Sequence, residues 1–264
     1  MHLFLSPHLD DAVLSCGGTI YQLTEQGASV SILTIMAGDP PDPLPDTPIV
    51  RDLHQRWKAG ENPVAIRRQE DIAAAKILHA SAQHREYGDC VYRVHNGVAL
   101  YPSEESLFGE VHPDDSLPGS LAIEAALINY VFLNIEAIYA PLGVGHHVDH
   151  QIIRDWALEI YRRNPTIEMF FYEEYPYTRD MKAIENAFNF FPAEFNLTST
   201  MAELNKQDVT AKIQAIACHQ SQLSTFWKTR AEMIKDVRQS FYIGDGNFGE
   251  RYWQITSGRN TDGK

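Results

Sequence analysis

The chain has 264 residues, of which 44% are hydrophobic and 11% are aromatic, so it can bury a substantial core. Its formal charge of -13 argues against a surface for nucleic acid or for an anionic membrane, because such partners need clustered lysine and arginine. We therefore expect a small partner that is uncharged or cationic.

The N-terminal segment and the cysteines indicate the compartment. The chain does not open on a basic region followed by a long apolar stretch, and no run approaches the ~20 apolar residues of a membrane span. The three cysteines are odd in number and far apart, which indicates neither a disulfide framework nor a cysteine zinc site: Cys16, Cys90 and Cys218. We expect a cytoplasmic protein that does not bind membranes.

A short apolar run at residues 3–7 is followed directly by His8, Asp10 and Asp11. The run predicts a buried strand, and the apolar spacing from residue 12 to residue 26 predicts a helix. The three side chains therefore lie in a strand-to-helix turn, where open α/β sheets bind their ligands. A carboxylate that only caps the helix is the simpler alternative, but it accounts for one acidic residue and not for two beside a histidine.

Strand patterns alternate with helical patterns along the chain. Apolar, β-rich runs occur at residues 3–7, 30–36, 137–141 and 167–172. Alternation of this kind is typical of βαβ units. We predict an α/β fold, a Rossmann-like three-layer sandwich with a mostly parallel sheet and an active site at the C-terminal edge of the strands.

Two stretches are predicted to be irregular: residues 39–62, which open on a proline-rich run, and residues 96–120. The first leaves the same sheet edge as His8, and we expect it to form a partial lid. Helical spacing after residue 201 predicts a C-terminal cap over residues 201–264. Because no internal repeat appears, we expect one domain, residues 1–264.

A second polar cluster follows the strand predicted at residues 137–141. It reads His147-Val148-Asp149-His150 and precedes a helix that begins near Val148. Residues three apart share one face of a helix, so His147 and His150 point together toward the edge that also carries His8.

The two clusters together supply the ligands of a catalytic metal. Catalytic zinc usually takes three protein ligands and leaves a fourth position for water, and His8, Asp11 and His150 fill that number. Zinc is the expected ion, although the same nitrogen and oxygen ligands accept Fe²⁺ or Co²⁺.

The remaining polar groups suit amide hydrolysis. Asp10 is free to act as the general base that takes a proton from the metal-coordinated water. His147, which faces the metal without binding it, suits stabilisation of the oxyanion or protonation of the departing amine. Asp149 either orients one of the imidazoles or is an ordinary acidic residue in the first turn of a helix. His146 is expected to point away from the metal.

These residues resemble the LmbE-like or PIG-L deacetylases, zinc-dependent enzymes that remove acetyl groups from N-acetylglucosamine conjugates. Pro7-His8-Leu9-Asp10-Asp11 is similar to the family motif (Pro/Ala)-His-Pro-Asp-Asp, and His147-Val148-Asp149-His150 is similar to His-x-Asp-His. The similar segments run from residue 3 to about residue 155, and residues 249–253 also look like family sequence. Leu9 departs from the family proline but removes no ligand.

The resemblance implies the same assignment of roles that the residues indicate. It implies His8, Asp11 and His150 as zinc ligands, Asp10 as the base, and His147 as the acid or oxyanion stabiliser. It also implies that an arginine at the start of the second helix faces the substrate. In this sequence the matching segment is Arg67-Arg68-Gln69-Glu70, and Arg67 is our choice.

Outside these two clusters, one segment matches the family motif but is not expected to bind metal, and two further residues are expected to reach the pocket. His112-Pro113-Asp114-Asp115 is literally closer to the family's first motif, but neither a buried strand nor a helix frames it, and we do not expect it to bind metal. Two side chains after the strand at residues 167–172, Glu173 and Tyr175, are expected to reach the pocket.

The sequence therefore predicts a zinc-dependent N-deacetylase that acts on a small amino-sugar conjugate. Three alternatives stay open: a non-haem iron oxygenase, an inactive or sugar-binding member of the family, and a mononuclear metallo-phosphoesterase. The alternation of strands and helices disfavours the oxygenase, whose His-x-Asp ligands lie on an all-β barrel. Whether the protein forms a homo-oligomer is left open.

Overall fold

The computed structural model describes residues 1–57, 62–128 and 134–256. Within this part of the chain, eight strands form one sheet in the order β3-β2-β1-β6-β7-β10-β8, and β9 pairs with β10. The strands are β1 (His2–Ser6), β2 (Val30–Thr34), β3 (Ser81–His84), β6 (Ala137–Pro141), β7 (Glu168–Tyr172), β8 (Asn196–Leu204), β9 (Tyr242–Gly244) and β10 (Asn247–Thr256). A separate hairpin joins β4 (Val94–His95) to β5 (Val98–Ala99).

The pairing of the strands confirms a mostly parallel sheet. β1 is parallel to both β2 and β6, β2 is parallel to β3, and β6 is parallel to β7. β10 lies antiparallel between β7 and β8, and β8 forms the edge of the sheet on that side. The C-terminal ends of the five parallel strands therefore meet at one edge, where the polar residues that follow β1 and β6 lie together.

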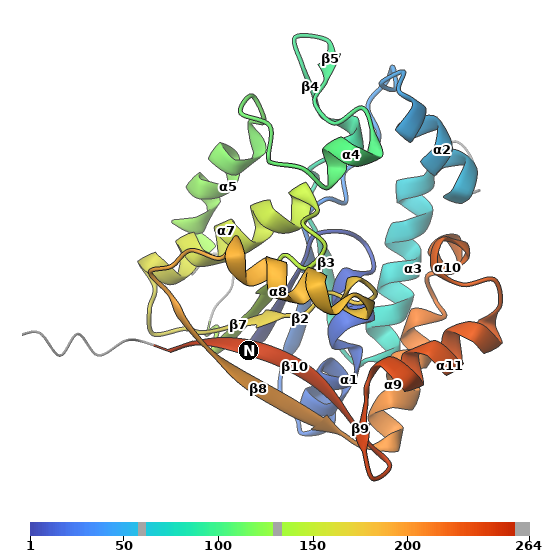
Figure 1. Cartoon of the computed structure of the whole chain (residues 1–264), viewed down its shortest axis with the longest axis vertical. Helices are drawn as coiled ribbons and strands as arrows, with labels where there is room; N and C mark the ends of the chain where they lie inside the picture. The colour runs from blue at the N-terminus through green and yellow to red at the C-terminus, as the bar shows by residue number, and fades with distance from the viewer. Residues whose placement is uncertain (58–61, 129–133, 257–264) are drawn as a thin grey trace, which may run out of the picture.

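Helices cover both faces of the sheet (Figure 1). They are α1 (Asp11–Glu25), α2 (Pro48–Trp57), α3 (Pro63–Ile77), α4 (Glu104–Leu107), α5 (Leu117–Ala125), α7 (Val148–Arg163), α8 (Met181–Asn189), α9 (Lys206–Ile216), α10 (Gln220–Phe226) and α11 (Arg230–Ser240), with 3₁₀ turns η1 (Cys90–Tyr92) and η2 (Tyr177–Arg179). Helices α5, α7 and α8 pack on one face, and α1, α3, α9 and α11 on the other. The predicted Rossmann-like sandwich is thereby confirmed.

The central strands are buried on both faces, which explains their continuous apolar runs. Leu3 and Leu5 of β1 pack with the α5/α7 side, whereas Phe4 packs with the α1/α9 side. A third apolar cluster lies among the loops beyond the strand ends and includes Leu9, Trp57 and Tyr101. The loops around the site therefore pack on a hydrophobic cluster that is separate from the two clusters on the faces of the sheet.

Two stretches predicted to be irregular contain regular structure. Helix α2 begins at Pro48, after the proline-rich run, because proline is tolerated in the first turn of a helix. Residues 96–120 include β5, α4 and the start of α5. Residues 58–61 of the first stretch, and 129–133 of the helix predicted near residue 121, lie outside the described residues.

The C-terminal region does more than supply helices. Residues 201–256 contain α9, α10 and α11 but also contribute the end of β8 and all of β10 to the sheet. A buried ion pair joins these layers, since Lys212 Nζ of α9 lies 2.6 Å from Glu250 Oε1 of β10. Glu250 also accepts backbone hydrogen bonds from Gly18 and Thr19 of α1.

No helix among the described residues is long and apolar enough to cross a membrane.

Candidate active site

The end of β1 and the start of α1 set the first group of site residues. The Ser6 hydroxyl accepts a hydrogen bond from the Ala12 N–H at 3.0 Å, so it satisfies a free donor at the start of the helix. Asp10 occupies the N-cap position but makes no capping hydrogen bond with its side chain. Helix capping therefore does not account for Asp10, whose carboxylate is left to face the cleft.

The start of α7 supplies the second group. His147 is the N-cap residue, and its Nδ1 accepts a hydrogen bond from the Asp149 N–H at 3.3 Å. His150 lies on the same side of the first turn and is 1% exposed. The aromatic rings of His8, His147 and His150 approach one another, with centroids 5.0 to 5.5 Å apart.

The three side chains predicted to bind the metal lie close together. Asp11 Oδ2 lies 3.1 Å from His8 Nδ1 and 3.4 Å from His150 Nε2, so these three groups could hold a metal ion together. The surrounding carboxylates favour a cation there. Burial opposes protonation of His150, but Asp11 and Glu174 outweigh it and raise the pKa of that imidazole to about 9. The donor set fits a divalent ion with nitrogen and oxygen ligands.

Asp149 contacts a different imidazole from the one beside it in the sequence. Its Oδ2 lies 3.0 Å from His8 Nε2 and accepts the Cys90 N–H, also at 3.0 Å. Its other oxygen pairs with the Arg93 guanidinium. Burial opposes ionisation of Asp149, but the charge of Arg93 prevails and holds the pKa of this carboxyl far below its ordinary value. Asp149 is thus an anion that contacts Nε2 of His8, the ring nitrogen opposite the one that faces Asp11.

Asp10 is placed to exchange a proton in the physiological range. Burial raises the pKa of Asp10 to about 6, against the opposing effect of Arg67. Arg67 Nη2 lies 3.6 Å from Asp10 Oδ1, and the guanidinium stacks over the Trp57 ring at 4.9 Å. Arg68 turns away to hydrogen-bond the Ala37 carbonyl at 2.6 Å. Of the two neighbouring arginines, Arg67 is the one that lines the cleft.

His147 is held as a neutral imidazole. Burial lowers the pKa of His147 well below its ordinary value, and the neighbouring His8 and His150 lower it further. Because Nδ1 accepts a backbone hydrogen bond, the neutral ring carries its proton on Nε2. The edge of the His147 ring also packs against Phe108. In this structure Nε2 lies 3.9 Å from Cys90 Sγ, and the contacts on both sides of the ring limit its rotation.

Most of these groups line one cleft of about 130 Å³. Its polar lining comes from the β1–α1 turn, α3, the segment after β3 and the N-cap of α7, and α2, η2 and α10 add aromatic or apolar groups: His8, Asp10, Asp11, Arg67, Asp89, His147, Leu53, Trp57, Tyr177 and Phe226. Helix α2, from the proline-rich stretch predicted as a lid, therefore forms part of the wall.

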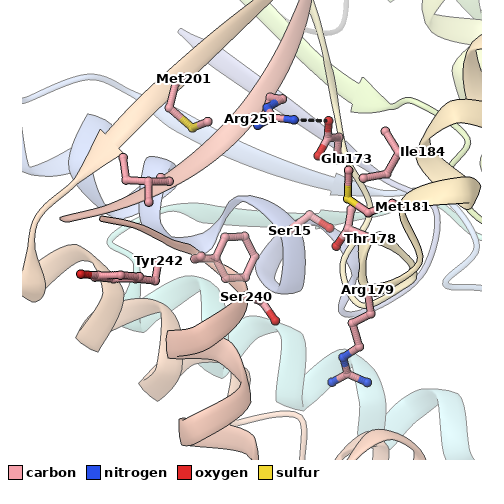
Figure 2. Close-up of a pocket in the computed structure, with 13 residues that line it drawn as sticks. Ser15, Glu173, Thr178, Arg179, Met181, Ile184, Met201, Ser240, Tyr242 and Arg251 are labelled. Atoms are coloured by element: carbon pink, nitrogen blue, oxygen red, sulfur yellow. Dashed lines mark ion pairs between the residues drawn. The ribbon is translucent and has the colours of Figure 1, made fainter. Parts of the chain in front are cut away.

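A larger cavity of about 300 Å³ is lined in part by Thr178 and Arg179 of η2 and by none of the proposed metal ligands (Figure 2). Glu173 lines it and faces Arg251, with an oxygen-to-nitrogen distance of 3.7 Å. Tyr175 instead donates a hydrogen bond to Asp236. The prediction that Glu173 and Tyr175 reach the cleft is wrong, because neither side chain lines it. Of the three consecutive residues Glu173, Glu174 and Tyr175, it is Glu174 that contacts His150.

The remaining predicted residues fall outside the cluster. His146 stacks on Phe190 at 4.0 Å and pairs with Glu110. His112 belongs to none of the metal-binding sets found among the described residues. Asp115, from the same His-Pro-Asp-Asp segment, is buried against Arg93.

Three buried or half-buried groups that contact His8, His150 or Asp149 were not predicted from the sequence. They are Asp89, whose Oδ2 is 3.8 Å from His8 Nε2, together with Arg93 and Glu174. Glu174 follows the strand predicted at residues 167–172, so the sequence could have predicted that it lies at the edge of the sheet that carries the site. Asp89 and Arg93 follow β3, whose sequence Ser-Ala-Gln-His lacks an apolar pattern and gave no sign of a strand.

Comparison with known proteins assigns the chain to a family. Residues 3–161, more than half of the chain, match the family model described as PIG-L, GlcNAc-PI de-N-acetylase. The chain therefore belongs to the PIG-L family.

Relatives and solved structures point to the same class. The chain is 28% identical over 186 residues to 2'-N-acetylparomamine deacetylase of Niallia circulans, covering 66% of each chain. It is 26% identical over 185 residues to 2'-N-acetylparomamine deacetylase of Streptomyces fradiae, covering 69% of this chain and 60% of that one. The matched part thus spans less than two thirds of either relative.

Among solved structures, the zinc-inhibited form of teicoplanin deacetylase Orf2 superposes with a TM-score of 0.81 at 26% identity, covering 98% of this chain and 99% of that one. All three similar proteins are deacetylases.

Proposed function

We propose that the protein is a metal-dependent N-deacetylase that removes an acetyl group from a small amino-sugar conjugate. The observation that carries the proposal is the convergence of His8, Asp11 and His150 on one point, with Asp10 and His147 on the wall of the same cleft. A hydrolase of an amide needs an ion or donors for the oxyanion and a base for the water, and this cleft contains a candidate for each.

The metal would be held by His8, Asp11 and His150, and zinc is the ion we propose. When bound there, it would polarise the acetamide carbonyl and lower the pKa of coordinated water toward ~7.

The protein's own residues divide the proton chemistry. Asp10, with a pKa of about 6, is mostly a carboxylate at neutral pH and takes the proton of the attacking water. It then carries that proton toward the departing amine. His147 acts as a neutral donor to the developing oxyanion, because its low pKa does not suit an imidazolium acid at neutral pH. Asp149 holds His8 in place from behind.

Charge supports an amino sugar over a phosphorylated substrate. Asp10, Asp11 and Asp89 line the cleft, while Arg67 is paired with Asp10. The chain as a whole carries a formal charge of -13. A neutral or cationic sugar suits this field better than a phosphate ester does, which disfavours the phosphoesterase alternative. All the ligand and base positions are filled, so nothing favours an inactive member of the family.

Acetate release tests the proposal. The protein is treated with a chelator, divided, and assayed with and without added zinc on N-acetylglucosamine, its glycosides and 2'-N-acetylparomamine. Zinc-dependent release of acetate from at least one of these is expected. Metal binding without turnover of any acetamide would reject this substrate class, and turnover that does not depend on metal would reject the mechanism.

A further inference from the structure

Three charged groups, Asp115, Arg93 and Asp149, form a continuous chain that ends on His8, a proposed metal ligand. Asp115 Oδ2 lies 2.9 Å from Arg93 Nε, and Arg93 also pairs with Asp149 Oδ1. Asp149 Oδ2 lies 3.0 Å from His8 Nε2. We propose that Arg93 and Asp115 are positioning residues for the metal site and act through Asp149 on the orientation of His8. This inference rests on the proposed function, since it assumes that His8 binds the metal.

Burial restricts the side-chain positions of Asp149, Asp115 and Arg93. Asp149 and Asp115 side chains are 0% and 1% exposed, and the Arg93 side chain is 12% exposed. Buried ions must be paired, because an unpaired one loses its hydration without compensation. If the Asp149 side chain rotated away from Arg93, it would leave a buried carboxylate without a paired charge, which is unfavourable. One carboxylate oxygen is fixed by the guanidinium, and the other is fixed toward His8.

The guanidinium also holds the turn that carries Asp89. Arg93 Nη1 donates to the Gly88 carbonyl at 3.2 Å, and the Cys90 N–H donates to Asp149. The turn at residues 88–90 is thus tied to α7 through the same ion pair. A lysine could not make all of these contacts, since its ammonium lacks the planar guanidinium group with which Arg93 reaches Asp149, Asp115 and the Gly88 carbonyl at once.

Asp115 is the residue that connects the segment His112-Pro113-Asp114-Asp115 to the site. Its carboxylate accepts hydrogen bonds from the Tyr101 hydroxyl at 2.8 Å and from the Leu117 N–H at 3.0 Å. The Arg93 guanidinium stacks over the Tyr101 ring at 5.3 Å. The neighbouring Asp114 side chain is 57% exposed. Only the second aspartate of the segment therefore reaches the site, and it does so through Arg93.

Zinc affinity in chosen variants tests the inference. An imidazole whose outer nitrogen loses its oriented partner typically binds metal about 10–100-fold more weakly. We expect Arg93→Lys, which keeps the charge, to raise the zinc dissociation constant roughly tenfold in competition with a chelator. Asp115→Asn should raise it less, in the same direction. Both should alter the visible absorption spectrum of the Co²⁺-loaded protein, which reports ligand geometry.

Two controls separate positioning from folding. Asp114→Asn makes the same change at an exposed neighbour and should bind zinc as the wild type does. Tyr101→Phe removes a hydrogen bond to Asp115 but keeps the charges, so it should lower the unfolding midpoint without changing zinc affinity.

The outcomes are distinguishable. If folded Arg93→Lys and Asp115→Asn both bind zinc and Co²⁺ as the wild type does, the inference is overturned. It is also overturned if Tyr101→Phe weakens zinc as much as Asp115→Asn does, because loop packing would then explain the effect. If the wild type itself binds no metal, the proposed function fails instead.

Discussion

Glu174 shows how one buried side chain organises two parts of the site. One carboxylate oxygen accepts the Gly143 N–H at 2.7 Å, and the other accepts the Val144 N–H at 3.0 Å. The first oxygen also lies 3.3 Å from His150 Nδ1. With a metal bound, this contact would keep the proton of the imidazole on Nδ1 and leave Nε2, which faces Asp11, as the ligand atom. Glu174 would thus orient His150 as a proposed ligand.

We predict that Glu174→Gln weakens zinc binding about 10–100-fold, because the amide is a poorer partner for the imidazole and cannot accept on both of its ends. Competition with a chelator measures the change. Glu173→Gln is the matched control, since Glu173 faces the other cavity (Figure 2) and should leave zinc affinity unchanged. Equal losses in the two variants would contradict the role given to Glu174.

At the residue scale, the sequence could indicate the proposed ligands but not the groups that contact them from outside. His8, Asp10 and Asp11 share one turn, so their nearness follows from the chain itself. Asp149 contacts His8, which lies 141 positions away, and no local pattern could reveal this pair. Arg67 was chosen over Arg68 on the family resemblance, and the different directions of the two side chains become visible only in the structure.

At the scale of elements, Asp236 ties α11 to η2 and to the end of α10. Its carboxylate accepts hydrogen bonds from the Tyr175 hydroxyl at 2.5 Å and from Trp227 Nε1 at 2.7 Å, and it pairs with Arg179. Burial opposes ionisation, but these partners prevail and lower the pKa of Asp236. The C-terminal helices are thereby joined to the segment that lines the cleft.

This contact predicts a stability difference that depends on pH. A depressed pKa contributes stability above the unfolded value of ~3.9, and the contribution is lost as the pH falls through the folded value. Asp236→Asn should therefore lower the free energy of unfolding by about 1 kcal/mol at pH 7, and the difference from wild type should shrink toward pH 3. Urea unfolding at several pH values measures it.

The control for this prediction is Asp46→Asn. Asp46 pairs with Arg51 at the surface, where its side chain is 90% exposed, so this variant should change stability by less than about 0.5 kcal/mol. A difference between Asp236→Asn and wild type that stays constant from pH 7 to pH 3 would rule out an ionised Asp236 as its source.

Elements with an apolar pattern were predictable, and those without one were not. The strands that became β1, β2, β6 and β7 are buried runs and were found within a few residues. β3 and β8 expose much of their surface and carry mostly polar residues, so their pairing with β2 and β10 decides their conformation. Tertiary pairing overrides local preference in such strands.

At the scale of the whole molecule, metal binding should stabilise the fold. The three proposed ligands come from two segments, the β1–α1 turn and the start of α7, and they converge only in the folded chain. A ligand that binds only the folded state stabilises it by about 2.7 kcal/mol at a hundred times its dissociation constant.

We therefore predict that zinc raises the thermal unfolding midpoint of the chelated wild-type protein by several degrees. For a chain of this size a change of 1 kcal/mol corresponds to roughly 2–4 °C. His150→Ala, which lacks one proposed ligand, should show little or no shift, as scanning calorimetry can measure. A full zinc-induced shift in His150→Ala would mean that the ion binds elsewhere.

The most direct test of the division of roles measures both the zinc content and the rate of acetate release in wild type and in Asp10→Ala. We expect Asp10→Ala to retain zinc, because Asp10 is not among the proposed ligands, yet to release acetate from an N-acetylated amino sugar about 10²–10⁴-fold more slowly. Loss of zinc together with activity would make Asp10 a ligand and contradict the division of roles. Acetate release at the wild-type rate would show that Asp10 is not the base.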